Sequence, residues 1–164
     1  MRKKCETPEY EVHPFRETTV ILVTEDAEQA GRVRQLLPQS LRHTLAWHRS
    51  LGDAVQLLRT RIPGRPVCVL VGHTSWAGTP AQAADLVHRR SPHATIVILL
   101  DLVPLAGPGL ATSAIDGLID TAECDTTAFS DTIVRALRRR ALSNTRRHRE
   151  ATRTRRRPEV ATDA

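Results

Sequence analysis

The apolar positions of the chain fall into short continuous runs that are separated by mixed segments. The runs at 18–26 (TTVILVTED), 66–72 (PVCVLVG) and 94–102 (ATIVILLDL) are typical of strands buried on both faces of a sheet. Shorter runs at 43–50 (HTLAWHRS) and 116–122 (DGLIDTA) predict an outer strand and a last short strand. The pattern therefore predicts five strands.

Between these runs, apolar residues recur roughly every three or four positions, which predicts helices. Ser50 and Thr79 have the residue types that cap a helix at its start. Strands that alternate with helices predict a parallel sheet covered on both faces, because parallel strands need crossover connections. The predicted helices are 27–37, 50–61, 79–90, a weak one at 108–115, and 126–142.

Composition narrows the class of protein. Of 164 residues, 40% are hydrophobic and only 3% aromatic, so the core must be built from Val, Leu, Ile and Ala. There is no run of about 18 uncharged apolar residues, and none follows the charges of residues 1–15, so we expect neither a membrane span nor a signal peptide. Cys5, Cys68 and Cys124 have no metal-ligand spacing, and Cys68 is expected to be a buried thiol. These features fit a reducing cytoplasm.

Charge is distributed unevenly along the chain. Residues 135–157 hold eleven arginines and one acid, a net charge of +10, whereas the rest of the chain has a net charge of −4. We therefore predict an N-terminal extension (1–17), one α/β domain (18–142), and an arginine-rich tail (143–164). The tail is nearly free of apolar residues and is expected to be disordered or only loosely helical.

The chain resembles a response-regulator receiver domain of the flavodoxin-like type over residues 18–142, through VILVTED, PVCVLVG and DGLID. This resemblance implies a doubly wound, five-stranded parallel α/β sheet with a basic C-terminal extension. In the family, acids that end the first strand bind Mg²⁺, and Glu25 and Asp26 match them. The third strand ends in the aspartate that takes the phosphoryl group, where this chain has Gly72.

The other family positions also differ. A Thr or Ser ends the fourth strand in the family, and here Leu99 or Leu100 stands there. A lysine ends the fifth strand, and here Asp120 and Thr121 match it. The resemblance therefore implies a degenerate pseudo-receiver that lacks the phosphoacceptor.

The chemistry of these residues agrees with that implication. Phosphoryl transfer to a protein needs a nucleophile and positive charge, and Gly72 supplies no nucleophile. His73 is the alternative phosphoacceptor. Glu25 and Asp26, with Asp101 and Asp120, form an oxygen-only set that suits Mg²⁺; the alternative is that Asp26 caps the next helix and the other acids are solvated. We expect no other cofactor.

The arginine-rich end predicts a contact with nucleic acid, because guanidinium groups suit phosphates. The alternatives are a solubilising linker and an anionic membrane surface, for which the segment lacks an apolar face. The candidate nucleic-acid-binding residues are Arg138, Arg139, Arg140, Arg146, Arg147, Arg149, Arg153, Arg155, Arg156 and Arg157.

Three functions follow from these features. The first is a non-enzymatic signalling module, such as a transcriptional regulator, that binds a protein partner or a second copy without phosphorylation. The family's dimerisation face would correspond here to Ala111–Ile115, Ile119 and the Arg135 side, and Trp76 is a candidate partner anchor. The second is a nucleic-acid-binding protein, and the third is a residual phosphatase-like enzyme. No membrane contact is expected.

Overall fold

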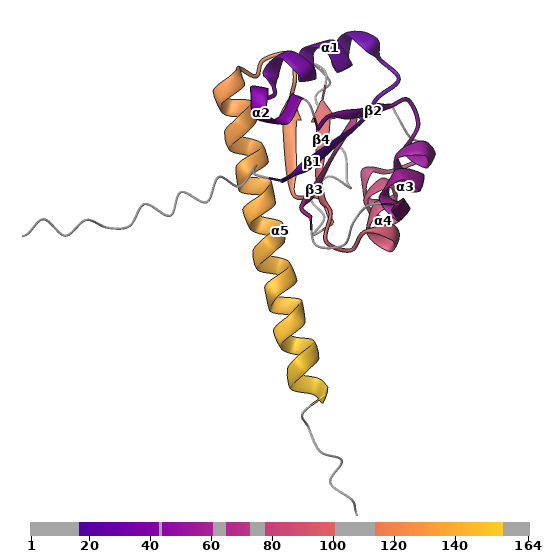
Figure 1. Ribbon diagram of the computed structural model, residues 1–164, viewed down its shortest axis with the longest axis vertical. Coiled ribbons are helices and arrows are strands. Elements are labelled where there is room, and N and C mark those ends of the chain that lie inside the picture. Colours follow the sequence, from indigo (N-terminus) through magenta and orange to yellow (C-terminus); the bar gives the residue numbers. More distant parts are fainter. Residues whose placement is uncertain (1–16, 43, 61–64, 73–77, 101–113, 156–164) are drawn as a thin grey trace, which may run out of the picture.

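Five parallel strands form one sheet with helices on both faces, as predicted (Figure 1). The computed structural model describes residues 17–42, 44–60, 65–72, 78–100 and 114–155. The strand order β2-β1-β3-β4-β5 is the flavodoxin-like order. The strands are β1 (Thr19–Val23), β2 (Ala46–His48), β3 (Val67–Gly72), β4 (Thr95–Leu100) and β5 (Gly117–Asp120).

The sheet is packed on both sides because successive strand residues point to opposite faces. The face that carries Leu22 packs against α1 (Ala27–Leu36) and α5 (Thr126–Arg155). The opposite face packs against α3 (Leu51–Thr60) and α4 (Pro80–Arg90). Figure 1 shows these two helix pairs on either side of the strands, so the domain has three layers.

Short polar side chains set the starts of the helices. The Asp26 carboxylate caps α1, and Asp125 accepts a hydrogen bond from the first turn of α5 at 2.7 Å. At α4, the hydroxyl of Thr79 and the amide of Gln82 each bond the other's backbone N–H, which completes a capping box. Thr79 is thus confirmed as the helix cap that the sequence predicts, and Asp26 has the capping role that was its alternative to metal binding.

A short helix that the sequence did not predict follows α1. Pro38 ends the first helix as expected, and the chain then forms α2 (Gln39–Arg42). The Arg42 guanidinium donates to the carbonyl oxygens of Leu37 and Gln35, at 2.9 Å each. These oxygens lie at the C-terminal end of α1 and have no partner within the helix, so α2 satisfies them.

Helix α5 is longer than predicted. Phe129, Ile133 and Leu137 pack it against the sheet, as the spacing predicts. The helix then continues to Arg155 and extends past the sheet (Figure 1), so that α5 as a whole is 30 residues long. Residues 143–155 are thus helical in the structure, whereas the sequence predicts a tail from residue 143 onward that is disordered or only loosely helical when alone. The packed half supplies the costly helix nucleus, and arginine is a good helix former that propagates it.

Cys68 lies in the core, as expected. Burial raises the pKa of its thiol to about 12, so the group is held neutral and unreactive.

Among the helices that the structure describes, none has both the length and the apolar character needed to cross a bilayer.

Candidate functional site

The carboxyl ends of the strands meet at one edge of the sheet, which is where ligands bind in open parallel sheets. Gly72 ends β3, is buried and pairs with Leu99. The position that the resemblance assigns to the phosphoacceptor therefore carries no side chain. His73 and Trp76 lie outside the residues that the structure describes.

The acid pair follows β1 at this same edge. Glu25 and Asp26 are both exposed. The Asp26 carboxylate accepts a hydrogen bond from the backbone N–H of Glu28 at 2.8 Å, which is the helix-capping role left open as the alternative to metal binding. Asp101 lies outside the described residues, and within the described ranges no three His, Cys, Asp or Glu side chains are grouped for a metal ion. Mg²⁺ binding at Glu25 and Asp26 stays a prediction.

The end of β5 is closed by local hydrogen bonds. The backbone N–H and the hydroxyl of Thr121 both donate to the carbonyl oxygen of Leu100, at 3.0 Å and 3.2 Å. The carboxylate of Asp120 accepts from the backbone N–H of Ala122 at 2.9 Å. Of the two residues that stand where the resemblance expects a lysine, Asp120 therefore stabilises the turn after the strand, and Thr121 joins the end of β5 to the end of β4.

The predicted dimerisation face needs correction. Ile115 and Ile119 are buried in the two halves of the core, so neither is available to a partner. Leu118, which points to the other side of β5 from Ile119, is 42% exposed instead. Arg135 is exposed on α5, as expected, and residues 111–113 lie outside the described residues.

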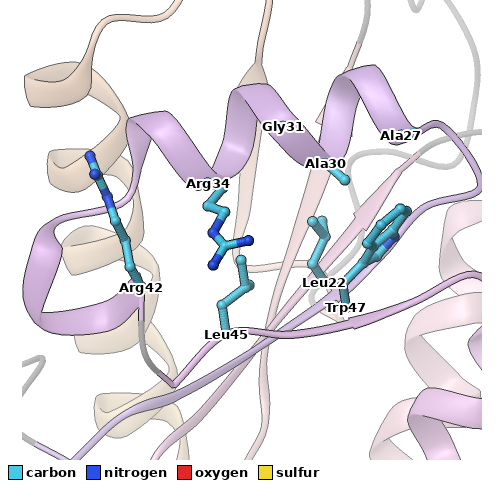
Figure 2. A pocket seen from close by; sticks show the side chains of 8 residues that line it. All are labelled: Leu22, Ala27, Ala30, Gly31, Arg34, Arg42, Leu45 and Trp47. Atoms are coloured by element: carbon cyan, nitrogen blue, oxygen red, sulfur yellow. The ribbon is translucent and has the colours of Figure 1, made fainter.

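A pocket of about 230 Å³ lies between α1 and β2 (Figure 2). The Trp47 indole N–H donates to the carbonyl oxygen of Thr24 at 2.9 Å, and Arg42 caps α1, so these two of the polar side chains that line the pocket are bonded to the backbone. The volume is below the roughly 300 Å³ at which small-molecule sites begin. The pocket is lined by Leu22, Ala27, Ala30, Gly31, Arg34, Arg42, Leu45 and Trp47.

The predicted nucleic-acid-binding arginines do not share one environment. Arg140 is wrong as a candidate, because its side chain is only 2% exposed and points inward from α5. The side chain of Arg155 is not described, and Arg156 and Arg157 lie outside the described residues. The exposed candidates are Arg138, Arg139, Arg146, Arg147, Arg149 and Arg153.

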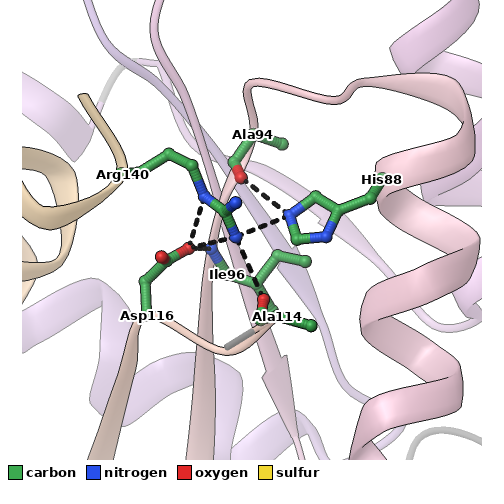
Figure 3. A network of polar contacts seen from close by, with 6 residues as sticks. All are labelled: His88, Ala94, Ile96, Ala114, Asp116 and Arg140. Atoms are coloured by element: carbon green, nitrogen blue, oxygen red, sulfur yellow. Dashed lines mark hydrogen bonds and ion pairs between the residues drawn. The ribbon is translucent and has the colours of Figure 1, made fainter. Parts of the chain in front are cut away.

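Arg140 instead forms a buried ion pair at the opposite end of the sheet from Gly72 (Figure 3). Its Nε and Nη2 atoms each lie 3.0 Å from Oδ2 of Asp116, the residue before β5. The same Oδ2 accepts the backbone N–H of Ile96 at 2.9 Å. Nη2 also donates to the carbonyl oxygen of Ala114 at 3.1 Å. The pair therefore ties α5 to the starts of β4 and β5.

His88 of α4 completes this network. Its Nε2 lies 2.8 Å from Nη2 of Arg140, and since a guanidinium only donates, Nε2 must accept and the ring must be neutral. Ala94 O also lies 3.2 Å from Nε2 and competes for that atom when it is protonated. Burial, and then the charge of Arg140, lower the pKa of His88.

Sequence reasoning missed this network, although the chain contains a signal for it. Arg140 continues the series of core-facing positions Phe129, Ile133 and Leu137, three residues further along the helix. A charged residue on an apolar helix face predicts a buried partner of opposite charge. Asp116, at the start of an apolar strand, is such a partner.

Comparison with known proteins shows the fold. No protein-family model matches the chain, and no curated protein matches it. The signal receiver domain of an HD domain-containing protein from Pseudomonas fluorescens Pf-5 is 21% identical, with a TM-score of 0.64 over 80% of this chain and 94% of that one. A response regulator receiver domain protein from Clostridium thermocellum is 12% identical, with a TM-score of 0.60 over 76% and 98%. The chain has the receiver-domain fold.

The receiver fold is also found in a structure described as an adenylate cyclase from Rhodopirellula baltica. That protein is 12% identical to this chain, with a TM-score of 0.62 over 80% of this chain and 95% of that one. Since a fold does not imply a function, the activity must be argued from the residues at the site.

Replacing Asp116 tests the buried ion pair. We expect Asp116→Ala to lower the free energy of unfolding by about 3–5 kcal/mol, because it leaves the Arg140 charge buried without its partner. Asp85→Ala, which removes an exposed acid from α4, is the matched control and should change it by less than about 0.5 kcal/mol. Chemical denaturation measures both, and equal effects of the two variants would contradict the account.

The lowered pKa of His88 predicts a pH dependence of stability. The folded state favours the neutral ring, so its contribution is full above the unfolded-state pKa of about 6.5 and is lost as pH falls toward the lower folded-state value. We expect the wild type to lose more stability than His88→Gln between about pH 7.5 and pH 5. Thermal unfolding of both proteins across this range measures the difference, and parallel curves would show that His88 does not titrate in this way.

Proposed function

We propose that this protein is a non-enzymatic regulatory module that uses a receiver fold to bind a protein partner without phosphorylation. The observation that carries the proposal is Gly72 at the end of β3. A phosphoryl group transferred to a protein must bond to a nucleophilic side chain, and this position has none.

The end of β5 supports the same conclusion. Charge that develops on a transferring phosphoryl group is stabilised by fixed cations or hydrogen-bond donors. Asp120, at the end of β5, carries a negative charge where a cation is needed. The Thr121 hydroxyl already donates to the carbonyl oxygen of Leu100. An acid at this position opposes the binding of a phosphoryl group.

A module without chemistry acts through its surfaces. β2 and β5 are the two edge strands of the sheet, and each exposes one large apolar side chain, Trp47 at 43% and Leu118 at 42%. The resemblance to receiver domains favours the β5 side for self-association. Leu118, with Arg135 exposed on α5, is therefore the proposed contact for a second copy of the chain.

Incubation with acetyl phosphate and Mg²⁺ tests the absence of phosphorylation. We expect the intact mass of the protein to stay unchanged, because Gly72 offers no carboxylate. A phosphoryl adduct on the wild type would contradict the proposal. His73→Gln, treated in the same way, would then show whether the neighbouring histidine is the acceptor.

Sedimentation velocity tests the proposed contact. We expect a concentration-dependent dimer for the wild type, and a monomer for Leu118→Arg, because a second guanidinium beside Arg135 would have to be desolvated without a partner of opposite charge. Trp47→Arg introduces the same charge at the other edge strand and should leave the dimer intact. The contact is wrongly placed if Trp47→Arg dissociates the dimer, and self-association is ruled out if the wild type sediments as a monomer.

A further inference from the structure

Most of the exposed arginines of α5 lie on one face of the helix. Each residue of an α-helix is rotated by about 100° about the helix axis relative to the one before it, and with this rotation six of the exposed arginines fall within an arc of about 100°. The buried residues of α5, among them Ile133, Ala136 and Arg140, lie on the opposite side and face the sheet. We call the six arginines within this arc the arginine stripe, and Arg147, although exposed, lies outside it. The stripe consists of Arg135, Arg138, Arg139, Arg146, Arg149 and Arg153.

The stripe exists because α5 does not end with the domain. From Arg135 to Arg153 the helix carries it over about 27 Å, at about 1.5 Å per residue. A disordered tail would scatter the same charges. The one acid among the residues after Arg140 in this helix is Glu150, whose carboxylate lies 3.1 Å from Nε of Arg146. Both side chains are exposed, so this pair neutralises little of the stripe.

We propose that the arginine stripe binds the phosphate backbone of nucleic acid. Each guanidinium presents several donors in a planar fork that matches the oxygens of a phosphate. Neighbours three or four residues apart on a helix lie about 5–6 Å from one another, so the stripe can engage successive phosphates. Each contact releases a counterion from the nucleic acid, which gives affinity that depends strongly on salt.

Nucleic acid fits this surface better than a membrane does. A helix that lies on a bilayer needs a wide apolar face beside its charged one, and the apolar face of α5 is already buried against the sheet. Within the arc of the stripe, Leu142 is the exposed apolar side chain, at 72%. One leucine does not provide the buried area that membrane binding requires.

The composition of the stripe also predicts the mode of binding. Residues 130–164 contain no Phe, Trp or Tyr on which a base could stack. Contacts to phosphates carry no direct sequence information. Binding should therefore be tolerant of sequence, and duplex DNA and duplex RNA share the chemistry that the stripe recognises. Arg135 belongs both to the stripe and to the proposed contact at Leu118, so the variants that test the stripe leave Arg135 unchanged.

Two triple variants of the full chain test it. The stripe variant combines Arg139→Gln, Arg149→Gln and Arg153→Gln. The control variant combines Arg59→Gln, Arg89→Gln and Arg90→Gln, which removes the same charge from exposed positions on α3 and α4. Glutamine is a good helix former, so both variants should fold, and circular dichroism checks this.

Fluorescence anisotropy measures binding to labelled duplex DNA and to duplex RNA of the same sequence, over about 50 to 200 mM salt. If all six arginines contact phosphates, the logarithm of the wild-type binding constant falls with log salt with a slope of about −5. The stripe variant should lose about half of that slope and at least about tenfold in affinity, whereas the control variant should keep both. The preferred duplex identifies whether DNA or RNA is the ligand.

Three results would overturn the proposal. The first is a wild type that binds neither duplex at the lowest salt, and the second is a control variant that loses as much affinity as the stripe variant. The third result is binding to phosphatidylserine vesicles, lost in the stripe variant, by a wild type that binds no duplex. That result would assign the stripe to a lipid surface instead.

Discussion

The buried ion pair between Arg140 and Asp116 is the contact on which the arrangement of α5 depends. It joins the helix to the start of β5, and through the N–H of Ile96 and the ring of His88 it reaches β4 and α4. A buried pair is weak evidence for net stability, because desolvation offsets the attraction between the charges. Its larger effect is on register, since a shift or rotation of α5 would separate the two charges and leave the buried Asp116 without its ion-pair partner. The direction in which the helix leaves the domain follows from that register.

The sequence predicts the sheet well, and for a physical reason. Strands buried on both faces must be apolar at every position, and helix starts need a capping side chain, so both leave a local record in the sequence. The glycine at the position of the phosphoacceptor can also be identified from the sequence, once the apolar strand that precedes it has been recognised. The prediction that Ile119 lies on the surface is wrong, because neighbouring residues of a strand point to opposite sides and it is Leu118, not Ile119, that is exposed.

The arginine-rich end was the least predictable part. Composition alone indicates disorder, because arginines bring no apolar area to a core. Composition does not show that the first half of α5 packs against the sheet. This packing lets the helix continue to Arg155. Arg140 shows the same lesson for one residue: an arginine is expected at the surface, and only its tertiary partner Asp116 makes burial acceptable. In the described part of α5, the structure thus separates one arginine that holds the fold from seven that face solvent.

Two regions of the molecule carry the two proposals. The edge of the sheet at Gly72 has no nucleophile and supports binding without phosphorylation, and the part of α5 beyond the sheet presents the arginine stripe. The continuity of α5 is the claim common to the fold and to the arginine stripe, and backbone ¹³Cα chemical shifts of Ser143 to Arg153 in the full chain measure it directly. The account predicts helical shifts throughout this segment, continuous with those of residues 126–142. Random-coil shifts from Ser143 onward would contradict it.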